Sequence, residues 1–120
     1  MNLICNWRNQ TPKIVHEIGI DYRLLSGQGM TPTETNNYCM KGGYYFAHAM
    51  LQPGKAYEAH SHSDHEEIYY VISGKGTIDL DGVVSPIRDG DAIYIEAGAS
   101  HSIANTGDDF LVFVAMGIQV

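Results

Sequence analysis

The stretch that decides the fold runs from Gly54 to Gly74 and reads GKAYEAHSHSDHEEIYYVISG. It holds a pair of histidines separated by one residue, a nearby carboxylate and a glycine at each end. A second stretch, from Gly90 to Asn105, reads GDAIYIEAGASHSIAN and supplies a further histidine. Imidazole and carboxylate groups are ligands that transition metals accept in proteins. The two stretches together therefore indicate a candidate metal site.

The spacing within these two stretches is similar to that of the cupin family. The positions that fit the first cupin motif, G(X)5HXH(X)4E(X)6G, are Gly54, His60, His62, Glu67 and Gly74. Those that fit the second motif, G(X)5PXG(X)2H(X)3N, are Gly90, Gly98, His101 and Asn105. Glu96 stands where the family has proline, and we expect its side chain to face solvent without loss of the site. The resemblance implies an all-β, antiparallel double-stranded β-helix, also called a jelly roll or cupin barrel.

The resemblance also implies a ligand set for one divalent transition metal ion per chain: His60, His62, Glu67 and His101. Three imidazoles and a carboxylate suit iron, manganese, nickel, cobalt or zinc. One carboxylate against a divalent ion leaves the site positively charged, so it should attract an anionic or enolizable substrate. An octahedral ion would keep open positions for water, dioxygen or substrate oxygens, which is the mark of a catalytic rather than a structural site.

Strand geometry accounts for part of this spacing. Side chains two residues apart on a strand share a face, so His60 and His62 should point the same way. Glu67 has the opposite parity, and a turn over residues 63–66 must reset the alternation before a new strand begins. Glu66 is the alternative carboxylate ligand. We favour Glu67 because its distance from Gly74 fits the motif.

Two further side chains are candidates for catalysis. Tyr69 follows Glu67 by two residues on the same predicted strand, so it should share the inward face and could move a proton. The alternative is that Tyr69 only packs in the core. His48 shares a strand face with Phe46 and Met50, and either lines the pocket or is satisfied within the core.

Four other polar or aromatic residues carry weaker expectations. Tyr57 differs in parity from His60 and should point outward or to the rim of the site. His65 falls in the predicted turn and should be solvated. His16 carries no spacing signal, and Asn105 should fix a loop.

Short strands separated by turns are expected throughout, because β-branched and aromatic residues dominate the segments between glycine-containing turns. No window of helical length shows a clean apolar period of 3.6 residues. Asp81-Gly82 is a strong hairpin signal. The expected strands are Ile14–Ile18, Tyr22–Leu25, Tyr44–Leu51, Tyr57–His62, Glu67–Ser73, Thr77–Leu80, Val83–Arg88, Ala92–Glu96, His101–Ala104 and Phe110–Met116.

Length and composition bound the remaining possibilities. The 120 residues predict one cupin domain, with N-terminal strands and a loop over 1–43 and the barrel over 44–120. The formal net charge of −7 and the lack of a basic run argue against a nucleic-acid partner. No apolar stretch could cross a bilayer and no secretory signal is visible, so we expect no membrane partner and a cytoplasmic location. The two cysteines should be free thiols.

Two classes of function compete at this point. The first is a metal-dependent enzyme, of dioxygenase, isomerase, lyase or cyclase type, acting on a compact anionic or carbonyl substrate. The second is a non-catalytic sensor or small-molecule-binding cupin. The full ligand set favours the enzyme, because a mere binding cavity needs no metal ligands. Small cupins also resemble one another in forming homodimers, and the apolar early strands with Trp7 are compatible with that.

Overall fold

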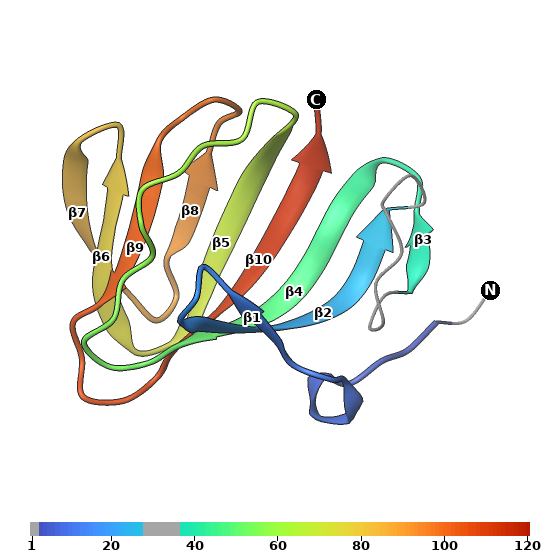
Figure 1. The fold of residues 1–120 in the computed structure, drawn as a ribbon, viewed down its shortest axis with the longest axis horizontal. Coiled ribbons are helices and arrows are strands. Elements are labelled where there is room, and N and C mark those ends of the chain that lie inside the picture. Colours follow the sequence, from blue (N-terminus) through green and yellow to red (C-terminus); the bar gives the residue numbers. More distant parts are fainter. Residues whose placement is uncertain (1–2, 28–36) are drawn as a thin grey trace.

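The computed structural model describes residues 3–27 and 37–120, which form two β-sheets facing each other (Figure 1). Part of the segment over 1–43 in which a loop is expected, residues 28–36, lies outside these residues. The larger sheet has the order β1 (Lys13–Val15), β2 (Gly19–Gly27), β4 (Gly43–Leu51), β10 (Leu111–Gln119), β5 (His65–Ser73) and β8 (Ala92–Ile95), with β3 (Tyr38–Met40) paired to β2. The smaller sheet has the order β7 (Val83–Arg88), β6 (Lys75–Leu80) and β9 (His101–Asn105). A single turn of 3-10 helix, η1 (Trp7–Asn9), precedes β1.

This arrangement confirms the predicted double-stranded β-helix. All strand pairs within the described residues are antiparallel except β2 with β3. The β6–β7 hairpin turns at Asp81-Gly82 as predicted, with both residues at positive φ (51° and 89°). The Asp79 carboxylate accepts a hydrogen bond from Gly82 N at 2.8 Å, which fixes this turn. Cys5 and Cys39 are free, as expected.

The N-terminal strands differ in length from the prediction. Strand β1 ends at Val15 rather than Ile18, because His16 and Glu17 adopt positive φ (49° and 67°) and begin the turn into β2. Strand β2 is correspondingly longer than expected, and β3 was not expected at all. Within the described residues, no helix is long and apolar enough to span a bilayer.

The inner face of the larger sheet changes from apolar to polar along the strands. Leu51 pairs with Leu111, and Phe113 lies between Ala49 and Val71 in the next row. These side chains are almost fully buried. They close one end of the space between the sheets.

Polar side chains occupy the following rows of the same face. Arg23, Ala47, Ala115 and Tyr69 lie side by side across β2, β4, β10 and β5. Tyr45, Gly117 and Glu67 form the next row. The two alanines and Gly117 are small, so the longer side chains beside them surround an open space instead of a filled core.

Candidate metal centre

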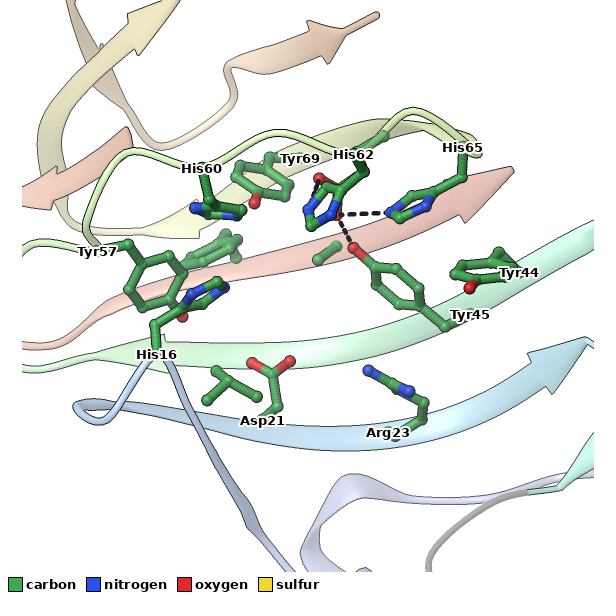
Figure 2. A pocket seen from close by; sticks show the side chains of 14 residues that line it. His16, Asp21, Arg23, Tyr44, Tyr45, Tyr57, His60, His62, His65 and Tyr69 are labelled. Atoms are coloured by element: carbon green, nitrogen blue, oxygen red, sulfur yellow. Dashed lines mark hydrogen bonds and ion pairs between the residues drawn. The ribbon is translucent and has the colours of Figure 1, made fainter. Parts of the chain in front are cut away.

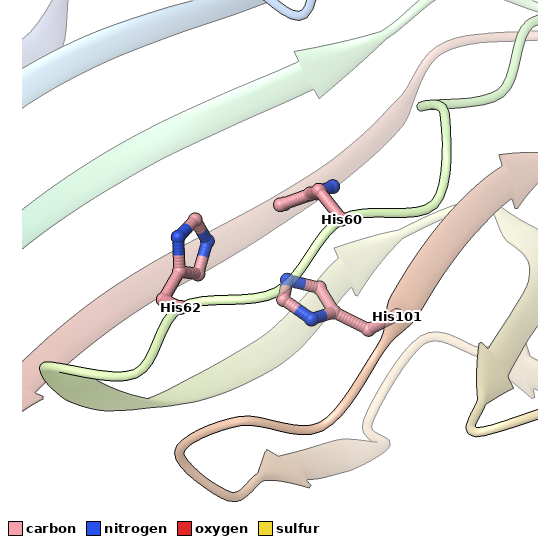
Figure 3. A group of neighbouring side chains, drawn as sticks. All are labelled: His60, His62 and His101. Carbon is pink, nitrogen blue, oxygen red and sulfur yellow. The ribbon is translucent and has the colours of Figure 1, made fainter.

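Three imidazoles converge at the polar end of the barrel (Figure 3). Candidate ligand nitrogens of His60, His62 and His101 all lie within 4.8 Å of one another. His60 and His101 face each other across a two-way backbone bridge, with N···O distances of 3.1 and 2.9 Å. Backbone pairing of two distant segments therefore sets the spacing of the cluster.

Backbone carbonyls orient two of these rings. Nδ1 of His60 lies 2.9 Å from the carbonyl oxygen of Glu58, and Nδ1 of His101 lies 3.0 Å from that of Ala99. With Nδ1 engaged in this way, Nε2 of each ring is left as the metal-binding atom. Carbonyl contacts of this kind fix the tautomer and direction of histidine ligands in metalloproteins.

The carboxylate of Glu67 reaches the cluster from the opposite sheet. Its Oε1 lies 3.1 Å from Nε2 of His101 and 3.3 Å from Nε2 of His62. The Tyr45 hydroxyl donates a hydrogen bond to the other carboxylate oxygen. Oε1 of Glu67 and Nε2 of His101 are both buried, and neither has a well-formed hydrogen-bond partner among the described residues. Buried atoms that can bind a metal and that converge without hydrogen-bond partners fit a shared metal ion, because such polar groups are otherwise costly to bury.

The protonation states of His60, His62 and Glu67 also suit a metal. Burial lowers the pKa of His60 and of His62, which keeps both imidazoles neutral, as ligands must be. Burial pushes the pKa of Glu67 upward, but the neighbouring His101 and Tyr45 side chains outweigh it, so this pKa lies below its ordinary value. Burial likewise opposes charge on His101, yet Glu67 raises its pKa. Glu67 is thus an ionised carboxylate at neutral pH.

Glu66 points the other way. Strand β5 already begins at His65, so the turn that resets the alternation is the bend at Ser63-Asp64 and is shorter than predicted. Glu67 consequently faces inward, and Glu66 lies on the outer face, where Tyr94 donates a hydrogen bond to it at 2.6 Å. Of the two carboxylates that the sequence leaves open, only Glu67 lies with the imidazoles.

The cluster opens onto a cavity of about 180 Å³ (Figure 2). His60, His62 and His65 lie along one side, and Asp21 and Arg23 of β2 lie on the other. Glu67 also lines the cavity. The remaining lining side chains are Val15, His16, Tyr44, Tyr45, Tyr57, Tyr69, Phe113 and Ala115.

The expectation that His65 is solvated is wrong. His65 is the first inward residue of β5 and is only 6% exposed. Its ring stacks between His62 and Tyr44, at centroid distances of 4.4 and 4.5 Å, and its Nδ1 lies 2.7 Å from a carboxylate oxygen of Asp64. The sequence did carry a signal for this placement: His65 precedes Glu67 by two residues, so on one strand both side chains share the inward face.

Tyr57 does not point outward as the simple alternation predicts. It is 4% exposed and lines the cavity, and its buried hydroxyl has no hydrogen-bond partner among the described residues. The expected strand over 57–62 forms only isolated bridges to β9, which pair Ala56 with Ala104 and His60 with His101. The first segment thus has one more residue between the bridges than β9 has. Such a bulge shifts the alternation by one, so Tyr57 and His60 both face inward.

His16 is a site residue that the sequence analysis missed. It occupies the β1–β2 turn, and its ring lies 4.1 Å from that of His60 and 4.5 Å from that of Tyr57. Burial, with a contribution from the imidazole of His60, lowers the pKa of His16 to about 4, so it is neutral at pH 7. No motif spacing marks this residue, because a turn far from both motifs carries it.

The remaining candidates are resolved by their neighbours. Tyr69 lines the cavity as expected and is 3% exposed. His48 lies on the opposite face of β4, stacked on Trp7 at 4.4 Å, and does not line the cavity. The prediction of a catalytic role for His48 is therefore not retained. Asn105 fixes a loop as expected: its amide donates to the carbonyls of Leu51 and Asp109 at 2.9 and 2.8 Å. Glu96 is exposed, also as expected.

Asp21 provides a test of the electrostatics of the cavity. Burial raises the pKa of its carboxyl to about 6, against 3.8 for an ordinary aspartate. Ionising Asp21 therefore costs stability: the cost is absent below pH 4, grows as the pH rises towards 6, and is complete above it. The free energy of unfolding of Asp21→Asn, minus that of wild type, should therefore be larger at pH 7 than at pH 3.5, by up to about 3 kcal/mol in the metal-free protein.

Urea unfolding of the metal-free wild type and Asp21→Asn at several pH values measures this difference. Asp89→Asn is the matched control, because Asp89 is exposed and does not line the cavity. A constant gap between wild type and Asp21→Asn from pH 3.5 to 7 would show that Asp21 is not held in a raised-pKa environment.

Known proteins place this fold and site in a family. The model of the cupin domain family matches residues 47–117, and the chain belongs to the cupin family. The chain is 41% identical over 71 residues to the oxalate-binding protein of Thermotoga maritima, a match that covers 59% of this chain and 59% of that relative. It is 32% identical over 88 residues to the glucose-6-phosphate isomerase of Thermococcus onnurineus, covering 62% of this chain and 47% of the relative.

A solved structure supports the same assignment over nearly the whole chain. The crystal structure of a predicted oxalate decarboxylase from Thermotoga maritima superposes with a TM-score of 0.83 at 29% identity, and covers 98% of this chain and 100% of that one. The curated relatives are longer than the matched region, which spans about half of their length. The N-terminal strands β1 to β3 lie outside the residues matched by the family model.

Proposed function

We propose that the protein is a metal-dependent enzyme that acts on a compact anionic or carbonyl substrate. His60, His62, Glu67 and His101 would hold one divalent transition metal ion. Bound there, the ion would supply Lewis-acid or dioxygen chemistry to substrate oxygens. The reaction class is that of a small cupin dioxygenase, isomerase, lyase or cyclase.

One observation carries this proposal. Three imidazoles and a buried carboxylate converge. Two of the atoms that would bind the ion, Oε1 of Glu67 and Nε2 of His101, are buried without a well-formed hydrogen-bond partner among the described residues. The cluster lies at the wall of a cavity and not within a filled core. A site that opens onto a cavity can accept a substrate beside its protein ligands, which a closed structural site cannot. The named oxalate-binding relative supports a small oxygen-rich ligand.

The tyrosines around the cavity suit proton donation. Burial, together with the negative charge of Glu67, raises the pKa of Tyr69 well above its ordinary value, and burial raises that of Tyr57. Both hydroxyls therefore keep their protons at neutral pH and can donate hydrogen bonds to a substrate oxygen. Tyr69 remains our catalytic candidate, with the role of proton donor rather than base unless a cation lowers its pKa.

The second candidate is a non-catalytic binding or sensor protein. The name of the Thermotoga relative, an oxalate-binding protein, favours it. Elemental analysis of the purified protein, followed by turnover assays with oxalate and small 2-oxo acids after loading with each metal, separates the two functions. Stoichiometric metal with turnover supports the enzyme. Stoichiometric metal and ligand binding without turnover would favour the sensor, and protein that takes up no metal would contradict the enzyme.

Tyr69→Phe tests the proton-transfer role. It removes one hydroxyl from the cavity while the ring keeps its contact with Phe113, at a centroid distance of 5.0 Å. We expect metal content and thermal stability to remain, and the turnover rate to fall by about 100-fold or more. An unchanged rate in Tyr69→Phe would restrict Tyr69 to packing, and a fall matched by loss of metal would assign it to support of the site.

A homodimer in the cytoplasm remains part of the proposal. The outer face of the larger sheet exposes Tyr70 (46%) and Ile72 (49%) on β5, and Tyr94 (57%) on the neighbouring strand β8. An apolar surface of this kind is suited to contact with another copy of the chain.

A further inference from the structure

The cavity has a second charged side, opposite the imidazoles (Figure 2). Asp21 and Arg23 are two residues apart on β2 and therefore share its inner face. Their cross-strand neighbours on β4 are Ala49 and Ala47, whose short side chains leave the space in front of them open. Both charged groups consequently line the cavity.

Arg23 is held in place, and no direct ion pair joins it to another side chain of the described residues. Its guanidinium lies 4.8 Å from the centroid of the Tyr45 ring, and Tyr45 is itself anchored by its hydrogen bond to Glu67. Gly117 allows this arrangement, because a Cβ there would lie 2.6 Å from the ring of Tyr45. The Nε of Arg23 is buried and has no hydrogen-bond partner in the described part of the chain.

Asp21, two residues away on the same face of β2, is a candidate counter-ion for Arg23. Among the contacts of the described residues, no ion pair joins Asp21 to Arg23. Burial raises the pKa of Asp21 to about 6 although Arg23 acts in the opposite direction. A carboxylate in a direct ion pair with an arginine would instead have a lowered pKa. Arg23 therefore keeps donor capacity for a group that enters the cavity.

The guanidinium of Arg23 is a cation inside the cavity of an acidic protein. The chain carries 7 Lys and Arg against 14 Asp and Glu, so a cation inside its cavity is not a consequence of a basic surface. A buried polar group without a partner is costly, which makes an incoming acceptor favourable. The planar guanidinium fork matches a carboxylate in two parallel hydrogen bonds.

Resting on the proposed function, we propose that Arg23 is a specificity-determining residue that binds the second carboxylate of a small dicarboxylate substrate. The other end of that substrate, a chelating group such as a 2-oxo acid, would face the histidine cluster. A chain of a few carbon atoms joins the two ends across the cavity. Oxalate differs from such a substrate because it has no carboxylate separated from its chelating group.

Two matched ligands test the proposal by calorimetry at pH 7. 2-Oxoglutarate and 2-oxopentanoate have the same chain length and the same 2-oxo acid end, but only the first has a distal carboxylate. Both are titrated into protein whose manganese content has been measured. Wild type should bind 2-oxoglutarate at least about tenfold more tightly, as expected for hydrogen bonds to a charged group.

The variants Arg23→Gln and Arg23→Lys assign this preference. Arg23→Gln should abolish it while leaving manganese content and the affinity for 2-oxopentanoate unchanged. Arg23→Lys, which keeps the charge but loses the fork, should retain part of it and serves if Arg23→Gln does not fold. Arg88→Gln is the control, because Arg88 is exposed on β7 and its loss should leave the preference intact.

Four results would overturn the inference. Wild type that holds manganese but does not distinguish the two acids, or binds neither, removes the role of Arg23 and leaves the proposed metal site standing. A preference for 2-oxoglutarate that survives in Arg23→Gln also removes the role of Arg23 and leaves the metal site standing. An equal loss of affinity for both acids in Arg23→Gln has the same meaning. Wild type that fails to hold any metal overturns the proposed function, and the assignment of Arg23 falls with it.

Discussion

Glu67→Ala is expected to weaken metal binding by at least about 100-fold, whereas Glu66→Ala leaves it nearly unchanged. The two residues are adjacent in sequence but face opposite sides of β5. Glu67 is 3% exposed and lies within 3.3 Å of the ring nitrogens of His62 and His101. Substitution of groups that merely support metal ligands already costs about 10-fold to 100-fold in metal affinity, so loss of the anionic ligand should cost at least as much.

Competition with a chromophoric chelator measures the affinity of each variant for zinc or cobalt. Circular dichroism serves as the check on folding, and the Glu66 variant controls for the loss of a charge at this point of the strand. The reverse order of affinities would make Glu66 the ligand. Equal, small effects in both variants would show that the imidazoles hold the ion without a carboxylate.

The side chains proposed as metal ligands were the most predictable part of the site. His60, His62, Glu67 and His101 follow from motif spacing, and the structure brings their side chains together. The sequence could predict them because a nearby turn or backbone bridge sets the spacing of the ligands within each motif. The spacing within it therefore reflects local backbone geometry, which the sequence carries directly.

The cavity wall was less predictable, and for identifiable reasons. Tyr57 was placed outward or at the rim of the site because unbroken alternation was assumed, and a bulge between two isolated bridges turns it inward. His65 was assigned to a turn that proved shorter than expected. These errors share one cause: a shift of one residue moves every later side chain to the other face of a strand.

His16, Asp21 and Arg23 depend on a different kind of information. They come from the β1–β2 hairpin, which lies outside the two motifs, and they reach the cavity only because β2 pairs with β4. Pairing between distant strands is not encoded in local periodicity. The half of the site that would hold the metal was therefore visible in the sequence, whereas the half proposed to select the substrate was not.

Phe113→Ala is expected to be the most destabilising single substitution considered, at about 3 to 5 kcal/mol. Phe113 is 1% exposed and lies between Ala49 and Val71 on the neighbouring strands. Because Ala49 is too small to expand into the space, removal of the ring leaves a cavity that the backbone of β10 cannot close. Total stabilities of small domains are about 5 to 15 kcal/mol, so this loss would remove a large share.

Urea unfolding of the metal-free protein measures the change, with Tyr70→Ala as the comparison. Tyr70 is an aromatic residue on the outer face of β5 and is 46% exposed, so its loss should cost about 1 kcal/mol or less. Similar costs for the two variants would contradict the assignment of Phe113 to the core. The ring of Phe113 also packs against the rings of Tyr57 and Tyr69, at centroid distances of 6.5 and 5.0 Å, and so supports both cavity tyrosines. The same substitution should therefore loosen the substrate side of the site while the imidazoles, held by the bridge between His60 and His101, keep their spacing.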